Sequence, residues 1–89
     1  MIYPVIDNVV ELNRRLIHLY GGYYSPPCNF SYENGLKWVL DAIQYPLFGN
    51  DLCPRLCDKS ALLGATIIRD HVFFDGNKRT GIASIELIL

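Results

Sequence analysis

A polar run at residues 71–81 organises this chain, and it reads His71-Val72-Phe73-Phe74-Asp75-Gly76-Asn77-Lys78-Arg79-Thr80-Gly81. Apolar side chains recur at helical intervals on both sides of the run. Upstream they predict a central, mostly buried helix that Asp58 caps, with a wide apolar face containing small residues: Ala61, Leu62, Leu63, Ala65, Ile67, Ile68 and Val72. Downstream a helix is predicted from Asn77 onward, through Ile82, Ile85 and Leu89. The run therefore predicts a loop, bent at Asp75-Gly76, between two central helices.

Two further helices are predicted closer to the N-terminus. The first begins near Asn8, which has Glu11 at the spacing of a capping box, and it ends at Gly21-Gly22. Its apolar positions are Val9, Leu12, Leu16 and Leu19. The second is capped by Ser31 and ends before Pro46, with one apolar stripe formed by Leu36, Val39, Leu40 and Ile43.

Residues 46–57 mix apolar side chains with Pro and Gly, which predicts a partly packed loop or a short hairpin rather than a flexible linker. No internal repeat and no β-alternation of useful length occur elsewhere in the sequence. We therefore expect an all-α fold and a single domain over residues 1–89.

The predicted fourth helix reaches Leu89 without a C-cap. Its apolar face, formed by Ile82, Ile85, Ile88 and Leu89, needs partners that a short chain supplies poorly. We expect another chain, or further residues of the same protein, to cover it.

The composition limits the partners of this protein. Of its residues 51% are hydrophobic and 19% are charged, which predicts one packed core. The formal net charge of -1 argues against nucleic acid and anionic membranes as partners, because both attract broad basic surfaces. No stretch approaches the roughly 20 apolar residues of a membrane span, and the N-terminus lacks the features of a secretory signal, so we expect a cytoplasmic protein.

The three cysteines cannot all pair, and reduced thiols fit best. Cys53 and Cys57 could share a helix face, but Cys28 and His18 lie in separate segments without a recognised zinc-ligand spacing. Cysteine side chains that fill gaps in the core are the better interpretation.

The loop and the helix that follows it favour anion binding. Gly76 allows a tight bend directly before a helix N-terminus, where unpaired N–H groups and the positive end of the helix dipole attract anions. The Asn77 amide can donate hydrogen bonds, Lys78 supplies a point charge, and Arg79 can grip two oxygens at once. The pattern therefore predicts a phosphate site.

Two further residues extend this site towards catalysis. A carboxylate beside a phosphate repels it unless a divalent cation lies between them, so Asp75 predicts Mg²⁺. His71 has a side chain suited to accepting a proton near neutrality, and it could activate a hydroxyl that attacks the phosphate. The set indicates phosphoryl or nucleotidyl transfer. Phe73 and Phe74 are interpreted as core anchors of the loop.

The run from His71 to Thr80 resembles the signature of the Fic/Doc superfamily, which reads His-x-Phe-x-Asp/Glu-Gly/Ala-Asn-Gly/Lys-Arg. Three further segments are similar in layout to death-on-curing (Doc-like) toxins: Leu19-Tyr20-Gly21-Gly22, the segment that ends near Gln44-Tyr45-Pro46, and the helix from Ala61 to Asp70. The resemblance implies a Fic-like helical bundle that binds ATP with Mg²⁺ and modifies a hydroxyl on a target protein. It also implies that His71 is the catalytic base, that Asp75 holds Mg²⁺, and that the nucleotide is bound by Gly76, Asn77, Lys78, Arg79 and Thr80.

Two positions depart from the pattern of the AMP-transferring members. Lys78 stands where those members usually carry Gly, and Ile82 stands where they carry a second Arg. Both departures are similar to the Doc-like branch, which implies transfer of the γ-phosphoryl group to a Ser or Thr hydroxyl of a protein such as elongation factor Tu. AMP transfer by the same site and a catalytically silent truncated module remain as alternatives.

Many members of this superfamily carry an inhibitory Ser/Thr-x-x-x-Glu-Gly/Asn helix. In this sequence the nearest candidate is Glu33-Asn34, which has Asn29 at the Ser/Thr position. The resemblance therefore implies inhibition in trans by an antitoxin.

Overall fold

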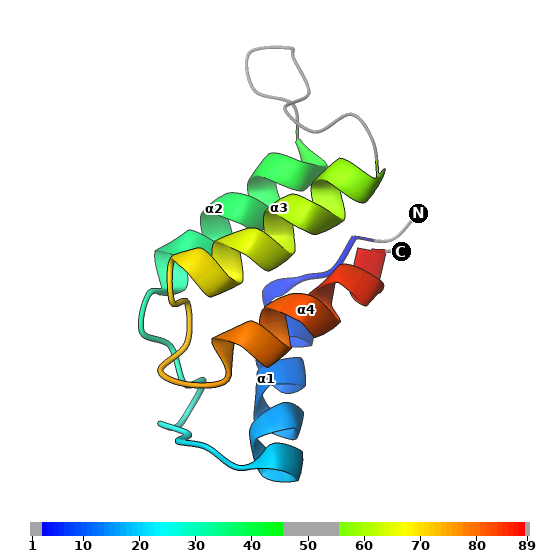
Figure 1. Cartoon of the computed structure of the whole chain (residues 1–89). Helices are drawn as coiled ribbons and strands as arrows, with labels where there is room; N and C mark the ends of the chain where they lie inside the picture. The colour runs from blue at the N-terminus through cyan, green and yellow to red at the C-terminus, as the bar shows by residue number, and fades with distance from the viewer. Residues whose placement is uncertain (1–2, 46–55, 89) are drawn as a thin grey trace.

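The computed structural model describes residues 3–45 and 56–88, which fold into four α-helices and contain no strand (Figure 1). The helices are α1 (Ile6–Tyr20), α2 (Glu33–Gln44), α3 (Leu56–Arg69) and α4 (Asn77–Ile88). This architecture confirms the predicted all-α class, with the polar loop between α3 and α4. The predicted hairpin concerns residues 46–57, of which 46–55 lie outside the described residues, whereas 56 and 57 open α3.

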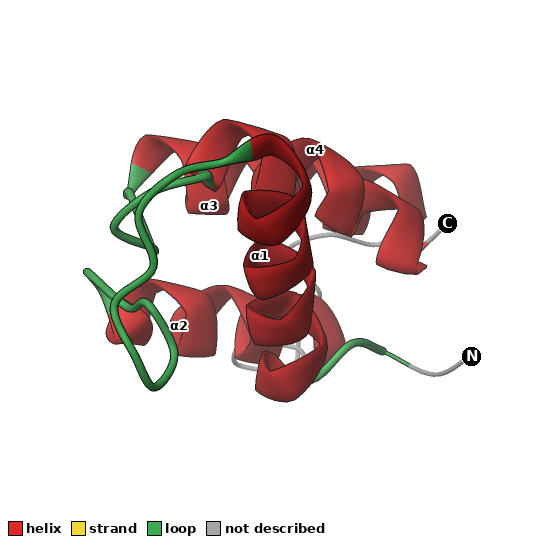
Figure 2. Cartoon of the chain, turned by 90° about the horizontal axis from the view of Figure 1, so that it is seen from below, coloured by secondary structure: helices red, strands yellow, loops and turns green. Residues whose placement is uncertain are grey.

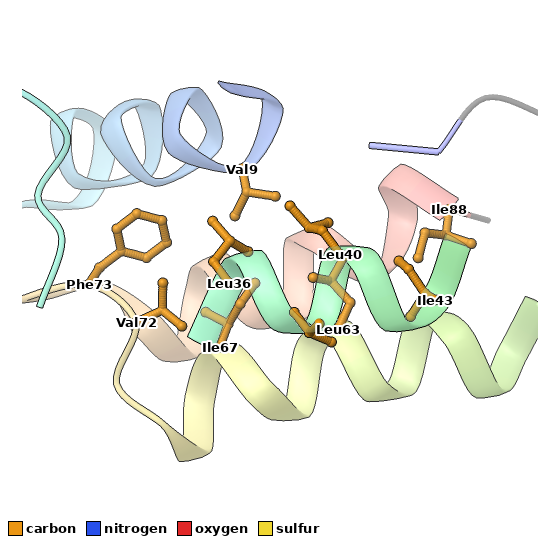
Figure 3. Close-up of a cluster of buried hydrophobic side chains, with 10 residues drawn as sticks. Val9, Leu36, Leu40, Ile43, Leu63, Ile67, Val72, Phe73 and Ile88 are labelled. Carbon is orange, nitrogen blue, oxygen red and sulfur yellow. The ribbon is translucent and has the colours of Figure 1, made fainter. Parts of the chain in front are cut away.

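The helix α3 is central, as the sequence predicts, because it packs against both α2 and α4 (Figure 1). The helix α1 crosses the others and contacts α4 and α2 (Figure 2). All four helices and the loop contribute to the buried cluster in Figure 3: Val9, Leu36, Val39, Leu40, Ile43, Leu63, Ile67, Val72, Phe73 and Ile88. Within the described ranges, no helix combines the length and the hydropathy needed to cross a bilayer.

The start and the buried face of α1 differ from the prediction. Val5 is the N-cap, and Asn8 lies inside the first turn, where its Oδ1 accepts a hydrogen bond from the Val5 N–H at 2.9 Å. The buried face is Val9, Asn13 and Ile17, and Leu19 is 71% exposed. The prediction followed the apolar side chains, whereas the fold buries a polar residue in the centre of the face.

The starts of α2 and α3 also differ from the predicted caps. The N–H groups of Ser31 and Tyr32 both donate to the Val72 carbonyl, at 2.9 and 3.0 Å, so the chain there is bonded to the loop and α2 begins only at Glu33. The predicted apolar stripe of α2 is confirmed as buried. Asp58 lies in the first turn of α3 rather than at its cap, because α3 begins at Leu56.

Two glycines allow α3 and α4 to approach closely. A Cβ on Gly81 would lie 2.8 Å from the Gly64 carbonyl oxygen, and one on Gly64 would lie 2.9 Å from the Gly81 carbonyl oxygen. The small residues of the predicted apolar face do not make this contact, since Ala61 and Ala65 are exposed and Gly64 makes it instead. This contact fixes the position of α4.

The buried face of α4 is more polar than predicted, since it consists of Thr80, Gly81, Ser84 and Ile88. Ile88 joins the core and Ile85 is half-buried, but Ile82 is exposed. The prediction of an apolar face through Ile82 is therefore wrong, and Leu89 lies outside the described residues.

Candidate functional site

A cleft of about 390 Å³ opens between the C-terminal half of α1, the loop after α3 and the first turn of α4. Six of the seven predicted site residues line it: His71, Asp75, Gly76, Asn77, Lys78 and Arg79. The rest of its lining is Leu16, Ile17, Gly21 and Phe74. The seventh, Thr80, is fully buried, and its Oγ1 accepts a hydrogen bond from Asn13 at 2.9 Å, so its side chain packs behind the cleft.

The loop is fixed by residues on either side of it. Phe73 is buried and stacks on Phe30 with 5.3 Å between ring centroids, as expected of a loop anchor. The Asn77 side chain bonds the Phe73 backbone twice, because its Oδ1 accepts from the N–H at 2.8 Å and its Nδ2 donates to the carbonyl at 2.7 Å. Asn77 was predicted to donate to an anion, but its amide is already engaged in closing the loop.

Phe74 is not a core anchor, which corrects the prediction. Its side chain is 56% exposed, lines the cleft, and meets Tyr23 edge to face with 6.2 Å between ring centroids. Successive side chains of an extended segment point to opposite sides, so Phe73 and Phe74 cannot both enter the core.

Asp75 is held as a carboxylate by two backbone donors. Its Oδ2 accepts from the Tyr23 N–H and its Oδ1 from the Gly76 N–H, both at 2.8 Å. Both bonds favour the ionised form and therefore lower the pKa of Asp75 below its usual value of 3.8. The bond from Tyr23 has the larger effect and the bond from Gly76 the smaller. The same bonds join the end of α1 to the loop, and Gly22 approaches closely enough that a Cβ there would lie 2.9 Å from Oδ2.

The pKa of Asp75 predicts a pH dependence of stability. A carboxyl whose pKa is lowered by folding stabilises the native state above its unfolded pKa, and this contribution is lost as the pH falls through the folded pKa. We therefore expect Asp75→Asn to unfold at lower urea concentration than the parent at about pH 6, and the difference to shrink below about pH 4. Asp41→Asn, on an exposed position of α2, is the control and should follow the parent at both pH values. If the difference in unfolding urea concentration between Asp75→Asn and the parent did not change with pH, the stabilising role of the ionised Asp75 carboxylate would be contradicted.

A buried polar network that sequence reasoning missed supports the loop from behind. The Asn13 amide donates to the Asp75 carbonyl and to Thr80 Oγ1, both at 2.9 Å, and its Oδ1 accepts from Asn29 Nδ2 at 3.0 Å. The carbonyl of Asn29 accepts from the Phe74 N–H at 2.9 Å. Asn13 and Asn29 are both buried. A polar residue between Val9 and Ile17, at helical spacing from both, was the signal in the sequence.

The first turn of α4 opens into the cleft. The first helical hydrogen bond of this turn runs from the Thr80 N–H to the Gly76 carbonyl at 2.9 Å. In the described part of the chain, the N–H groups of residues 77–79 have no acceptor, as expected at a helix N-terminus. Lys78 and Arg79 are exposed beside them. The Arg79 guanidinium lies over the Tyr20 ring, 4.3 Å from its centroid.

His71 follows α3 in a left-handed conformation, with φ of 49°, and its exposed side chain lines the cleft. Asp75 is the acidic residue of the lining. Over residues 3–45 and 56–88 no three His, Cys, Asp or Glu side chains gather into a metal site, and Cys28 is a half-buried free thiol. One ionised carboxylate fits the usual mode of Mg²⁺ binding, in which one or two carboxylates act together with substrate phosphates.

Comparison with known proteins identifies similar sequences. A family model described as the Fic/DOC family matches residues 4–89. Toxin Doc of Mycolicibacterium smegmatis (strain ATCC 700084 / mc(2)155) is 46% identical over 41 residues, which are 46% of this chain and 32% of that protein. The match thus spans about a third of the length of this relative. No solved structure matches the chain.

Proposed function

The chain belongs to the Fic/DOC family, and we propose that it acts as a Doc-like toxin, transferring the γ-phosphoryl group of Mg-ATP to a Ser or Thr hydroxyl of a target protein. The observation that carries the proposal is the convergence of His71, Asp75 and the free N-terminus of α4 on one cleft. The similarity to Toxin Doc supports the choice of the Doc-like branch.

The phosphate chain is bound at the first turn of α4. Residues 77–79 line the cleft, their backbone N–H groups have no acceptor in the described part of the chain, and a helix N-terminus carries about half a positive charge. Lys78 and Arg79 add two full charges from the rim of the cleft. These groups stabilise the charge that develops on the oxygens of the transferring phosphoryl group.

His71 acts as the general base. Its imidazole accepts the proton of the attacking hydroxyl, whose oxygen forms a bond to the γ-phosphorus while the bond to the bridging oxygen breaks and ADP leaves. The left-handed backbone of His71 turns the chain directly after α3 and places the side chain at the cleft.

Asp75 would hold Mg²⁺, which neutralises charge on the phosphate oxygens when it is bound. The carboxylate suits this role because its lowered pKa keeps it ionised. Each oxygen accepts one backbone hydrogen bond and retains further lone-pair capacity for a cation.

The choice of phosphoryl over AMP transfer rests on Lys78 and Ile82. Arg79 is the guanidinium among the residues that line the cleft, and Ile82, one turn further along α4, is an exposed apolar side chain in the neighbouring cavity. The phosphates of the nucleotide are therefore bound by one Arg and one Lys, which favours a nucleotide orientation different from that in a site with two arginines. AMP transfer is the second candidate, and a silent module is the third.

The proposed partners are a protein with a Ser or Thr hydroxyl, such as elongation factor Tu, and an antitoxin in trans. Glu33 is not among the residues that line the cleft, where an inhibitory glutamate would lie, and it forms an ion pair with Lys37 on its own helix at 3.0 Å. Asn29, at the Ser/Thr position of the inhibitory pattern, is buried in the network behind the loop.

Labelled ATP tests the proposal. The purified chain is incubated with a bacterial lysate, Mg²⁺ and ATP labelled at the α- or the γ-phosphate. We expect label in a protein band from γ-labelled ATP alone. His71→Asn should abolish this label, by at least about 100-fold, because loss of a general base costs roughly 10²–10⁴ in rate. Asn tolerates the left-handed backbone, so this variant removes the base without strain.

His18→Asn is the control, because His18 is the other histidine of the sequence, is exposed on α1 and is not among the residues that line the cleft. It should label as the parent does. Label from α-labelled ATP would establish AMP transfer instead. Absence of label from both, in this chain and in a C-terminally longer form, would establish the silent module.

A further inference from the structure

Arg79 occupies a wall shared by two cavities. It lines the cleft with His71 and Asp75, and it also lines a neighbouring cavity of about 390 Å³ together with Tyr20 and Ile82. A long exposed side chain at such a place has many rotamers, and fixing it costs conformational entropy. A residue that holds it in one position before a ligand arrives removes part of that cost.

The contact made by Arg79 is of an unusual kind for a cation. Within the described residues, 3–45 and 56–88, no carboxylate lies at ion-pair distance from the Arg79 guanidinium, although Glu86 lines the same neighbouring cavity. The guanidinium carbon instead lies 4.3 Å from the centroid of the Tyr20 ring. Stacking uses the flat face of the guanidinium and leaves the N–H donors along its edge available, whereas an ion pair would occupy them and neutralise the charge.

Tyr20 has no evident task in the core. It is the last residue of α1 and is 63% exposed, and the described part of the chain gives its ring no aromatic partner and its hydroxyl no hydrogen bond. The next residue, Gly21, ends α1 and lines the cleft. The C-terminus of α1 therefore places the ring in the neighbouring cavity, one residue before the cleft-lining Gly21.

We propose that Tyr20 is a positioning residue, which holds the Arg79 guanidinium at the cleft with its N–H edge free to bind the oxygens of a phosphate. The proposal rests on the proposed function in so far as the phosphate belongs to Mg-ATP. It requires the aromatic ring and not the hydroxyl. Tyr20 itself does not touch the ligand, so its effect passes through Arg79.

The test compares Tyr20→Leu, Tyr20→Phe and Tyr45→Leu. Tyr45 is 58% exposed at the C-cap of α2, so its variant repeats the loss of an exposed tyrosine ring away from the cleft. Binding of Mg-ATP and of inorganic tripolyphosphate is measured by titration calorimetry. We expect Tyr20→Leu to weaken both about fivefold, the scale of an exposed cation–π contact, and Tyr20→Phe and Tyr45→Leu to bind as the parent does. Thermal unfolding should show that all of these variants are folded at the temperature of the titrations.

A second measurement separates positioning from general damage. In the background Arg79→Ala, which removes the guanidinium, Tyr20→Leu should cause no further loss of affinity, because the two residues act as one unit. Equal affinities of Tyr20→Leu and the parent, or an unchanged loss in the Arg79→Ala background, would overturn the proposal.

Failure of the proposed function gives a different result. If tripolyphosphate binds and depends on Tyr20 while labelled ATP transfers nothing, the positioning role stands and the transferase proposal fails. If neither probe binds the parent, the cleft is no oxyanion site and both fail.

Discussion

Replacement of Asn13 by Asp is expected to be the most destabilising single change in this protein. The Asn13 amide donates to the Asp75 carbonyl and to Thr80 Oγ1, and a carboxylate can supply neither bond. The substitution also places a charge at a position with no solvent exposure. We expect a loss of about 3–5 kcal/mol in the free energy of unfolding, measured by urea denaturation followed by circular dichroism.

Loss of the buried network behind the loop should also affect ligand binding at the cleft. Because Asn13 connects α1 to the loop and to α4, we expect the variant to lose the proposed binding of Mg-ATP at temperatures where it is still folded. Asn13→Leu separates two causes, since it removes the donors without adding a charge and should cost less than Asp.

Asn34→Asp is the matched control for this prediction. Asn34 is exposed in the first turn of α2, where a negative charge is favourable to the helix dipole. It should match the parent within about 0.5 kcal/mol. If Asn13→Asp were as stable as this control, the buried network would have no structural role.

Replacement of Gly81 by Ala is expected to have the second largest effect. In most helix interiors this change stabilises by roughly 0.5–1 kcal/mol, because alanine loses less backbone entropy on folding. At Gly81 the new Cβ would lie 2.8 Å from the Gly64 carbonyl oxygen, which is backbone of α3 and cannot move without separating the two helices. We expect a net loss of about 3 kcal/mol in unfolding experiments.

Gly35→Ala tests whether the contact partner decides the sign. Its new Cβ would meet the Tyr32 ring at 2.9 Å, but Tyr32 is an exposed side chain that can rotate away. We expect this variant to stay within about 1 kcal/mol of the parent. Similar losses for the two variants would mean that the α3–α4 contact adds nothing beyond ordinary helix interior effects.

Gly81→Ala should also weaken the proposed binding of Mg-ATP. The glycine lies in the second turn of α4, two positions after Arg79, the last residue of this helix that lines the cleft. A shift of α4 away from α3 moves the first turn of α4 relative to Asp75 and His71. Titration calorimetry on the folded variant measures this loss.

Much of the fold follows from local patterns. The stripe of Leu36, Val39, Leu40 and Ile43 places α2 correctly, and Gly21 ends α1 as predicted. The caps were less predictable, because the backbone N–H of Ser31 donates to the carbonyl of Val72, in a distant part of the chain, and α2 begins only at Glu33. Helix periodicity is a property of neighbouring residues, whereas a helix start depends on every donor and acceptor nearby.

The sequence by itself determined the all-α class, the polar loop between two central helices, and the placement of His71, Asp75, Lys78 and Arg79 together, because these residues lie within nine positions of one another. The tertiary structure alone decided which of two adjacent phenylalanines enters the core, and that Thr80 faces Asn13 across 67 positions of sequence. It also placed Tyr20 against Arg79. The physical reason is that contacts between distant segments depend on how the helices pack, and the spacing of residues along one helix does not specify that packing.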